Sequence, residues 1–342
     1  MKAMILNRIS DVGENQTPLE PAELPVPVPA EGELLVRLSA CGVCHTELDE
    51  IEGRTPPPVL PVVPGHQAVG IVEKTGSGPG AGRIGERVGI AWIYSTCGRC
   101  AQCRAGNENL CRRFRATGRD ANGGYAQYLT VPERYAFSIP DRFSDTEAAP
   151  LLCAGAIGYR SLRLSGLENG RSLGLTGFGA SAHIVLKLAA HAYPDSSIFV
   201  FARSEMERTF ARELGAVWTG EIGEKPPQKI DCIIDTTPVW RPVIEALSCL
   251  SPGGRLVINA IRKEEADKDQ LLRLDYPVHL WEEREIKSVA NVTAADVREV
   301  LATAAAIPLI PEVREYALEE ANRALVELKT GRIRGAKVLR ID

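Results

Sequence analysis

The pattern of hydrophobic and polar residues changes after Gly155. Before it, short apolar stretches alternate with polar positions, as in residues 33–40, and turns and prolines separate them. This pattern predicts half-buried strands. After it, buried apolar runs such as residues 172–176 alternate with segments of helical periodicity, which predicts a doubly wound parallel sheet. We therefore expect an α/β protein with a β-rich part and a parallel-sheet part.

The order of these segments predicts the domain organisation. We expect one domain over residues 1–154, completed by residues 290–342, and a second domain over residues 155–289. In the second domain we expect strands at 172–176, 197–202, 231–235, 255–259 and 286–291, and helices at 206–214 and 242–250. The return segment is predicted to hold a helix at 318–329, ended by Gly331, and a last strand at 336–341.

The bulk composition excludes several classes of protein. A length of 342 residues suits two domains, and 44% hydrophobic residues suffice for real cores. The net charge of −4, without a basic block, argues against a nucleic-acid binder. The start lacks a signal peptide, and no run of about 18 apolar residues predicts a membrane span. We expect a cytoplasmic protein that binds neither nucleic acid nor membrane.

Four cysteines lie within fifteen residues, spaced C-x2-C-x2-C-x7-C. Four such thiolates can surround one tetrahedral ion, which predicts a closed, structural zinc site, and nearby arginines offset its excess negative charge. Disulfides or an iron–sulfur cluster are the alternatives; the spacing departs from ferredoxin patterns. The predicted structural zinc ligands are Cys97, Cys100, Cys103 and Cys111.

Three other potential ligands have ordinary explanations when each is taken alone. Cys44 could pair with Cys41 as a redox couple, and His66 could be a hydrogen-bonded turn residue. Cys153 could be a small buried hydrophobic residue. Their order along the chain, on either side of the cysteine loop, instead favours a functional role for all three.

The motifs Gly42-Val-Cys-His-Thr46, Pro64-Gly-His66, the cysteine loop, residues 123–128 and residues 149–155 occur in this order. Together they resemble the zinc-dependent medium-chain alcohol dehydrogenases, and most closely the bacterial propanol-preferring enzymes. The resemblance runs over essentially the whole chain. It implies a GroES-like β-rich catalytic domain, a Rossmann cofactor domain and a homo-oligomer, either a dimer or a tetramer.

The resemblance also implies the roles of individual residues. Cys44, His66 and Cys153 would hold a catalytic zinc with an open position for the substrate. Thr46 would begin a proton relay, and Asp49 stands where many relatives end it with a histidine; Thr46 could instead be a helix N-cap. Two positions depart from the family pattern, Glu47 for aspartate and Gln67 for glutamate. Trp92 would line the alcohol pocket, or be an ordinary strand aromatic.

Residues 177–182 carry the pattern G-x-G-x-x-A between a predicted strand and a predicted helix, which indicates a dinucleotide-binding turn. An acid normally follows the second strand in NAD enzymes, but here the position is Ala202. Arg203 and Ser204 could bind a 2′-phosphate, so we expect NADP(H) in preference to NAD(H); an exposed arginine at a strand end is the alternative. The predicted cofactor residues also include Gly177, Gly179, Ala180 and Ser181 and, by resemblance, Asn291 near the nicotinamide and Arg332 or Arg334 near the pyrophosphate.

We therefore expect a zinc-dependent oxidoreductase with two zinc ions per chain, acting on small to medium primary alcohols or aldehydes. Secondary, polyol or aromatic alcohols with NAD(H) are the alternative substrates. A non-catalytic protein that binds NADPH and zinc as a sensor is the alternative outside enzymes.

Overall fold

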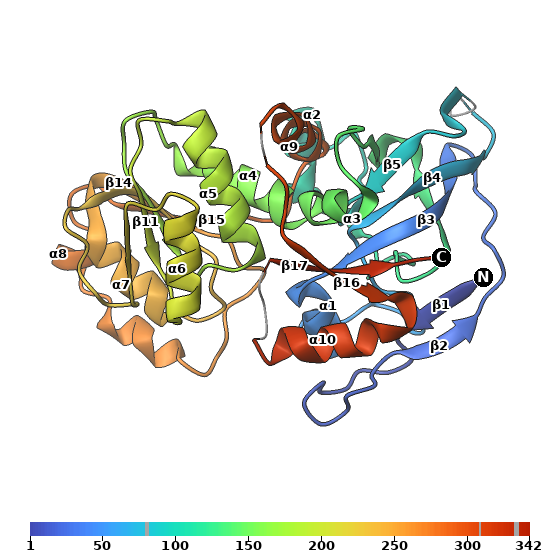
Figure 1. Ribbon diagram of the computed structural model, residues 1–342, viewed down its shortest axis with the longest axis horizontal. Coiled ribbons are helices and arrows are strands. Elements are labelled where there is room, and N and C mark those ends of the chain that lie inside the picture. The colour runs from blue at the N-terminus through green and yellow to red at the C-terminus, as the bar shows by residue number, and fades with distance from the viewer. Residues whose placement is uncertain (79–81, 308, 332–334) are drawn as a thin grey trace. The chain divides into compact units, whose positions relative to one another are not determined.

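The computed structural model describes residues 1–78, 82–307, 309–331 and 335–342. The chain divides into two compact units (Figure 1). The first unit comprises Met1–Ala156 and Asn291–Asp342, and the second comprises Ile157–Ala290. The C-terminal segment thus belongs to the same unit as the N-terminal half.

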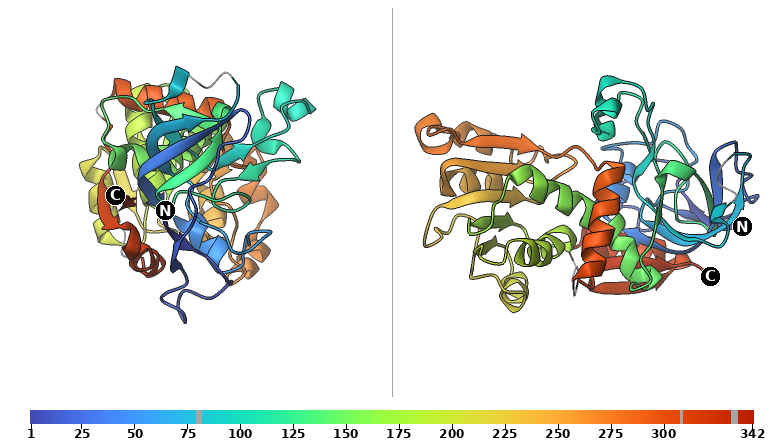
Figure 2. Two further views of the ribbon diagram at one scale, coloured as in Figure 1. Left: turned by 90° about the vertical axis from the view of Figure 1, so that its right-hand side faces the viewer. Right: turned by 90° about the horizontal axis from the view of Figure 1, so that it is seen from above.

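The first unit is built around strand β3, which pairs with β17, β4 and β8. The predicted strand at 33–40 is confirmed and continues to Val43, but it is more than half buried: Leu34, Leu35 and Val36 are all buried and only Arg37 is exposed. Strand β17 comes from the C-terminal segment yet lies beside β3 (Figures 1 and 2). The sheet comprises β3 (Glu33–Val43), β4 (Ala68–Thr75), β5 (Arg87–Ile90), β8 (Tyr128–Pro132), β9 (Ala136–Ser138), β16 (Val313–Ala317) and β17 (Ala336–Arg340).

Two small sheets and several short helices complete the first unit. Ser144 and Thr293 are the N-caps of helices α3 and α9, and their hydroxyls accept the backbone N–H three residues on. The small sheets pair β1 (Lys2–Ile5) with β2 (Glu20–Glu23) and β6 (Ile93–Ser95) with β7 (Arg115–Ala116). The helices are α1 (His45–Ile51), α2 (Ala101–Arg104), α3 (Asp145–Ala148), α9 (Ala294–Ala306) and α10 (Ala321–Lys329).

The C-terminal helix differs from its prediction only at its start. A 3-10 turn, Leu318–Glu320, precedes α10, whereas the pattern predicted one continuous helix from 318. The predicted end is confirmed, because Gly331 adopts a φ of 73° and its N–H donates to the carbonyl of Leu328 over 3.1 Å.

The second unit holds a six-stranded sheet whose strands are all parallel, in the order β12-β11-β10-β13-β14-β15. The predicted doubly wound sheet is confirmed. Chain order diverges on either side of the β10–β13 pair, the place where such sheets bind ligands at their carboxyl edge. The elements are β10 (Leu173–Thr176), β11 (Ile198–Phe201), β12 (Trp218–Gly220), β13 (Ile230–Asp235), β14 (Leu250–Ile258), β15 (Glu285–Ser288), α5 (Ala180–Ala192), α6 (Glu205–Glu213), α7 (Arg241–Cys249) and α8 (Tyr276–His279), and α4 (Ala154–Ser165) leads into the unit.

One expectation for this unit is corrected. The predicted helix at 242–250 ends at Cys249, because Leu250 already pairs with Ile230 as the first residue of β14. In α5, His183 is fully buried, and its Nδ1 lies 3.2 Å from the carbonyl of Gly179. Helix periodicity shows which residues share a face, but not which faces a neighbouring element covers.

Candidate metal and cofactor sites

Three separated segments of the first unit bring Cys44, His66 and Cys153 together. Cys44 lies between β3 and α1, His66 precedes β4, and Cys153 follows a 3-10 turn. The His66 Nε2 lies 3.6 Å from the Cys44 Sγ and 3.2 Å from the Cys153 Sγ. All three ligand atoms lie within 4.8 Å of one another. The residues proposed as catalytic metal ligands therefore form one cluster.

The turn that presents His66 depends on Gly65. This residue has a φ of 98°, and a Cβ atom on it would lie 2.4 Å from the ring of Tyr125. Both the backbone conformation and the close approach of the ring therefore require glycine. Tyr125 is fully buried, so it holds the turn in place from the inside.

Glu47 connects two of the three ligands. Its side chain is fully buried, and its Oε1 lies 2.5 Å from the Nδ1 of His66. Its Oε2 accepts the backbone N–H of Cys44 over 2.9 Å. Because the carboxylate occupies Nδ1, the imidazole turns Nε2 toward the two sulfur atoms. The glutamate thus contacts both His66 and the backbone of Cys44.

The electrostatics of the cluster suit a cation. The pKa of the Cys44 thiol is raised well above its usual value by the contact with the Cys153 thiol, by burial and by the charge of Glu47. Burial alone would lower the pKa of His66, but the charges of Glu47 and Cys44 outweigh it and raise that pKa well above its usual range. A divalent cation would relieve this accumulation of negative charge. Two sulfurs and one imidazole nitrogen fit zinc.

Helix α1 places Thr46 and Asp49 three residues apart, on one helix face. The N-cap of α1 is Cys44, whose Sγ accepts the backbone N–H of Thr46 over 3.4 Å, so the N-cap alternative for Thr46 is wrong. Asp49 is buried, and its carboxylate lies 2.5 Å from the Nε of Arg54. The residue that stands in place of a relay histidine is therefore an ion-paired carboxylate.

Trp92 lies beside the metal-ligand cluster. It occupies a bend between β5 and β6, so it is not the strand aromatic that was the alternative. Its ring centroid lies 6.4 Å from that of His66 and 5.6 Å from that of Phe114. Gln67 is buried against Gly42, and its Nε2 has no hydrogen-bond partner among the described residues. A neutral amide thus stands where many relatives carry a carboxylate.

The cysteine loop forms a second cluster of sulfur ligands. Cys97 lies 3.5 Å from Cys111 and 3.9 Å from Cys103, measured between Sγ atoms, and Cys103 lies 3.5 Å from Cys100. Backbone N–H groups of Arg99 and Cys100 lower the pKa of the Cys97 thiol to about 6. All nine cysteines of the chain are free thiols, so the disulfide alternative is wrong. Four converging sulfurs fit a closed structural zinc site.

The glycine-rich turn of the second unit joins β10 to α5. Gly177 has a φ of 79°, and a Cβ atom on it would lie 2.9 Å from the Thr236 Oγ1. Gly179 is the N-cap of α5, and a Cβ atom on it would meet nothing within 4 Å. The space beside Gly179, at the N-terminus of α5, is therefore open, next to the predicted cofactor residues Ala180 and Ser181. A phosphate group suits this position.

The end of β11 determines what could bind the adenosine ribose. Ala202 is buried, whereas Arg203 is exposed and its guanidinium has no partner among the described residues. Ser204 is the N-cap of α6, and its hydroxyl accepts the N–H of Glu207. The nearest acid, Glu205, is ion-paired with Arg208 and Arg212, so it does not replace the missing carboxylate.

Lys263 is a residue that the sequence analysis did not single out. Its side chain is 7% exposed, and its Nζ contacts the fully buried carboxylate of Asp235 and donates to the carbonyl of Thr237 over 2.7 Å. Asp235 also accepts the hydroxyl of Thr176 over 2.6 Å. This network joins the carboxyl ends of β10 and β13 beneath the turn at Gly177.

Replacing Lys263 by methionine is expected to destabilise the second unit by about 3 kcal/mol, because it leaves the Asp235 carboxylate buried without its cation. Chemical denaturation measures the loss. The double variant Lys263→Met with Asp235→Asn should recover part of it, and an unchanged unfolding free energy in the single variant would contradict this role.

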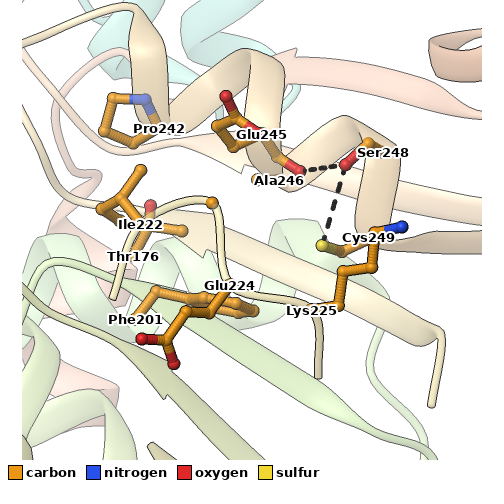
Figure 3. A pocket seen from close by; sticks show the side chains of 11 residues that line it. Thr176, Phe201, Ile222, Glu224, Lys225, Pro242, Glu245, Ala246, Ser248 and Cys249 are labelled. Atoms are coloured by element: carbon orange, nitrogen blue, oxygen red, sulfur yellow. Dashed lines mark hydrogen bonds between the residues drawn. The ribbon is translucent and has the colours of Figure 1, made fainter. Parts of the chain in front are cut away.

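A small cavity of about 70 Å³ lies against the sheet of the second unit (Figure 3). Thr176 and Phe201, at the ends of β10 and β11, line it together with Glu245 and Cys249 of α7. The volume corresponds to only a few water molecules. It is too small for a dinucleotide, so we assign it no substrate.

Asn291 is the first residue of the returning segment. It has a φ of 59°, and its Oδ1 accepts the N–H of Val292 over 2.7 Å. Its Nδ2 is buried without a partner among the described residues. Arg332 and Arg334, the predicted pyrophosphate contacts, lie outside the described residues. No helix in the described part of the chain is long and apolar enough to cross a membrane.

One unit holds a parallel sheet of the kind that binds nucleotides, and the other, β-rich unit holds two clusters of cysteine-containing metal ligands. Together these features are typical of a class of two-domain oxidoreductases. The model of the "Alcohol dehydrogenase GroES-like domain" matches residues 30–141. The chain is 45% identical over 329 residues to "Probable alcohol dehydrogenase AdhA" of Mycobacterium tuberculosis, covering 95% of this chain and 93% of that protein. It is 32% identical over 354 residues to an alcohol dehydrogenase of Geobacillus stearothermophilus, covering 100% and 99%.

Among solved structures, AibC superposes with a TM-score of 0.88 at 25% identity, covering 100% of this chain and 96% of that one. The chain belongs to the zinc-type medium-chain alcohol dehydrogenase family. The predicted family and fold class are thereby confirmed, and the protein is an oxidoreductase of the alcohol dehydrogenase type.

Proposed function

We propose that the protein is a zinc-dependent enzyme that transfers a hydride between NADP(H) and small to medium primary alcohols or aldehydes. The observation that carries this proposal is the convergence of Cys44, His66 and Cys153, with Glu47 fixing the imidazole. A second zinc in the cysteine loop would have a structural role, because its four sulfurs leave no open position.

The chain's own residues would orient the substrate and move its proton. Bound between Cys44, His66 and Cys153, zinc would supply a Lewis acid that polarises the substrate oxygen. Thr46, two residues after Cys44, would accept the alcohol proton, and Asp49 stands one turn further along α1. Because Asp49 is ion-paired with Arg54, we expect this carboxylate to orient the relay, with water carrying the proton onward.

The preference for NADP(H) rests on Arg203. This exposed guanidinium follows β11 directly, where an NAD enzyme normally places an acid. A 2′-phosphate there would meet a free cation and no uncompensated carboxylate. Because the hydroxyl of Ser204 already caps α6, we assign it a smaller part in phosphate binding.

Replacing Arg203 by alanine is expected to lower kcat/KM for NADPH about 10- to 100-fold, the loss of one charge-assisted phosphate contact. The value for NADH should stay within about twofold, because NADH lacks the 2′-phosphate. Steady-state kinetics with both cofactors measure the ratio. An equal loss for both cofactors would contradict phosphate recognition by Arg203.

A homo-oligomer is supported by the edge of the second unit's sheet. All four residues of β15 are exposed, and exposed apolar side chains lie on or near it, including Trp281 and Ile286. An exposed, apolar edge strand is a pairing surface that monomeric proteins avoid. A second copy of this chain would cover it, and we place the protein in the cytoplasm.

The proposed activity is tested with a substrate and cofactor panel on a zinc-analysed sample. We expect reduction of propanal with NADPH, with lower kcat/KM for ketones, sugar aldehydes and aromatic aldehydes. Faster turnover of ketones, sugar aldehydes or aromatic aldehydes than of propanal would show that the proposed substrate class is wrong. Zinc and NADPH binding without any turnover would favour the sensor alternative, which the changes at Glu47, Asp49 and Gln67 first suggested.

A further inference from the structure

The ammonium group of Lys263 lies inside the second unit, in the segment that follows β14. It contacts the Asp235 carboxylate and donates to the backbone carbonyls of Thr237 over 2.7 Å and of Val239 over 3.0 Å. An ammonium group has three N–H donors, and these contacts use all of them. Lys263 thus has no donor left for a bound phosphate, so it can affect a ligand only through residues 235–239.

Residues 236 and 237, which follow β13, pack against the glycine turn. The N–H and the hydroxyl of Thr236 both donate over 3.0 Å to the carbonyl of Thr176, the residue before Gly177. The hydroxyl of Thr237 donates to Asp235 over 2.7 Å. A Cβ atom on Gly177 would lie 2.9 Å from the Thr236 Oγ1 and 3.0 Å from the Thr237 methyl carbon. The backbone of the turn therefore rests on these two threonine side chains.

One cation holds the middle of this loop in shape. The acceptors of Lys263 belong to Asp235, Thr237 and Val239, and the ammonium draws all three toward one point. The far end of the loop is held separately, because the Asp267 carboxylate accepts the N–H of Trp240 over 2.8 Å. Loss of the ammonium should therefore loosen residues 236–239 without detaching helix α7.

The conformation of the glycine turn determines how well it can bind a dinucleotide. Pyrophosphate binds where the turn lets the backbone approach closely at the N-terminus of the following helix, here α5. A turn that is ordered only when the ligand arrives loses affinity, because binding must then supply the cost of ordering it.

We propose that Lys263 is a positioning residue for the dinucleotide, which holds residues 235–239 against Gly177 and so keeps the glycine turn in its binding conformation. The inference rests on the proposed function, since it takes NADP(H) to bind at this turn. Because its donors are used within the chain, Lys263 acts on NADPH and NADH equally, whereas Arg203 acts on NADPH alone.

The proposal is tested by equilibrium titration of zinc-loaded protein with NADPH and with NADH, well below the melting temperature and without substrate. We expect Lys263→Met to raise the Kd of both cofactors about 10-fold, by the same factor for each. The double variant Lys263→Met with Asp235→Asn no longer buries an unpaired charge, so it should regain stability while its affinity stays low. An unchanged Kd in Lys263→Met would overturn the proposal, as would a double variant that regained full affinity together with stability.

The matched control is Lys337→Met, which breaks a similar ion pair in the first unit. The Lys337 side chain is 4% exposed, and its Nζ lies 3.0 Å from the Glu327 carboxylate and donates to the Tyr316 hydroxyl over 2.6 Å. This variant should lose stability but keep the Kd of both cofactors within about twofold. An equal loss of affinity in Lys337→Met and Lys263→Met would show that general destabilisation is the cause, and the proposal would fall.

Hydrogen exchange in the absence of cofactor tests the loosening itself. Peptides that cover residues 174–182 and 234–240 should exchange about 10-fold faster in Lys263→Met, whereas peptides of the first unit should not change. Equal exchange at the turn in both proteins would overturn the proposal. Neither measurement needs turnover, so a protein that binds NADPH but converts no alcohol would refute the proposed function while the titrations still decide the role of Lys263. A chain that binds neither cofactor would refute both.

Discussion

Replacing Cys44 by serine is expected to lower turnover of alcohols and aldehydes at least about 1,000-fold, because removing one of three ligands loosens the metal that polarises the substrate. Zinc should fall from about two to about one per chain. The fold should survive, since Cys44 is the N-cap of α1 and a serine hydroxyl caps helices well. Metal analysis, circular dichroism and kinetics on one sample measure the three quantities.

The matched control is Cys249→Ser, because Cys249 is a buried cysteine of the second unit whose thiol contacts Ser248 rather than a metal ligand. It should retain turnover and both zinc equivalents. If Cys44→Ser kept more than a tenth of the original kcat/KM at full zinc content, the catalytic assignment of the cluster would be wrong.

Replacing Cys103 by serine is expected to remove zinc from the cysteine loop and to destabilise the first unit by about 3–5 kcal/mol, as loss of a structural metal does. The Sγ of Cys103 contacts the Sγ atoms of Cys97 and Cys100, and Cys103 is 9% exposed. Without it the remaining thiols would lose the cation that they share. For a unit of this size the melting temperature should fall by about 10 °C. Thermal unfolding monitored together with zinc release measures the effect.

Cys232→Ser serves as the control for this second variant. The Cys232 thiol donates to the carbonyl of Ser165 over 3.3 Å, and a serine hydroxyl can make the same bond. Its melting temperature should stay close to that of the original protein. Equal melting temperatures for Cys103→Ser and the original chain would show that the cysteine loop needs no metal to fold.

Features carried by local spacing could be predicted from the sequence. The cysteine loop, the glycine turn at Gly177 and the parallel strands each depend on residues close together in the chain. In the structure the four cysteine sulfurs lie close together, and the glycine turn joins β10 to α5, as expected. Cys44, His66 and Cys153 are far apart in sequence, so their convergence was implied by resemblance to a family and by no local pattern.

Partnerships between side chains could not be predicted in the same way. Nothing in the spacing indicates that Asp49 pairs with Arg54 or that Lys263 reaches Asp235, because these contacts depend on the path of the chain after α1 and after β14. The same holds for Glu47, whose helical position shows neither its burial nor its contact with His66. Charged residues at separated positions become informative only when burial is known.

The central claim, that zinc held by Cys44, His66 and Cys153 enables alcohol dehydrogenase activity, is tested most directly by metal removal and return. Propanal reduction by NADPH is measured on metal-free protein and again as zinc is added in known amounts, with zinc content determined on each sample. We predict that activity is lost on removal and returns in proportion to zinc bound at the Cys44 cluster, and that Cys44→Ser recovers none. Full turnover by a zinc-free sample would contradict the account.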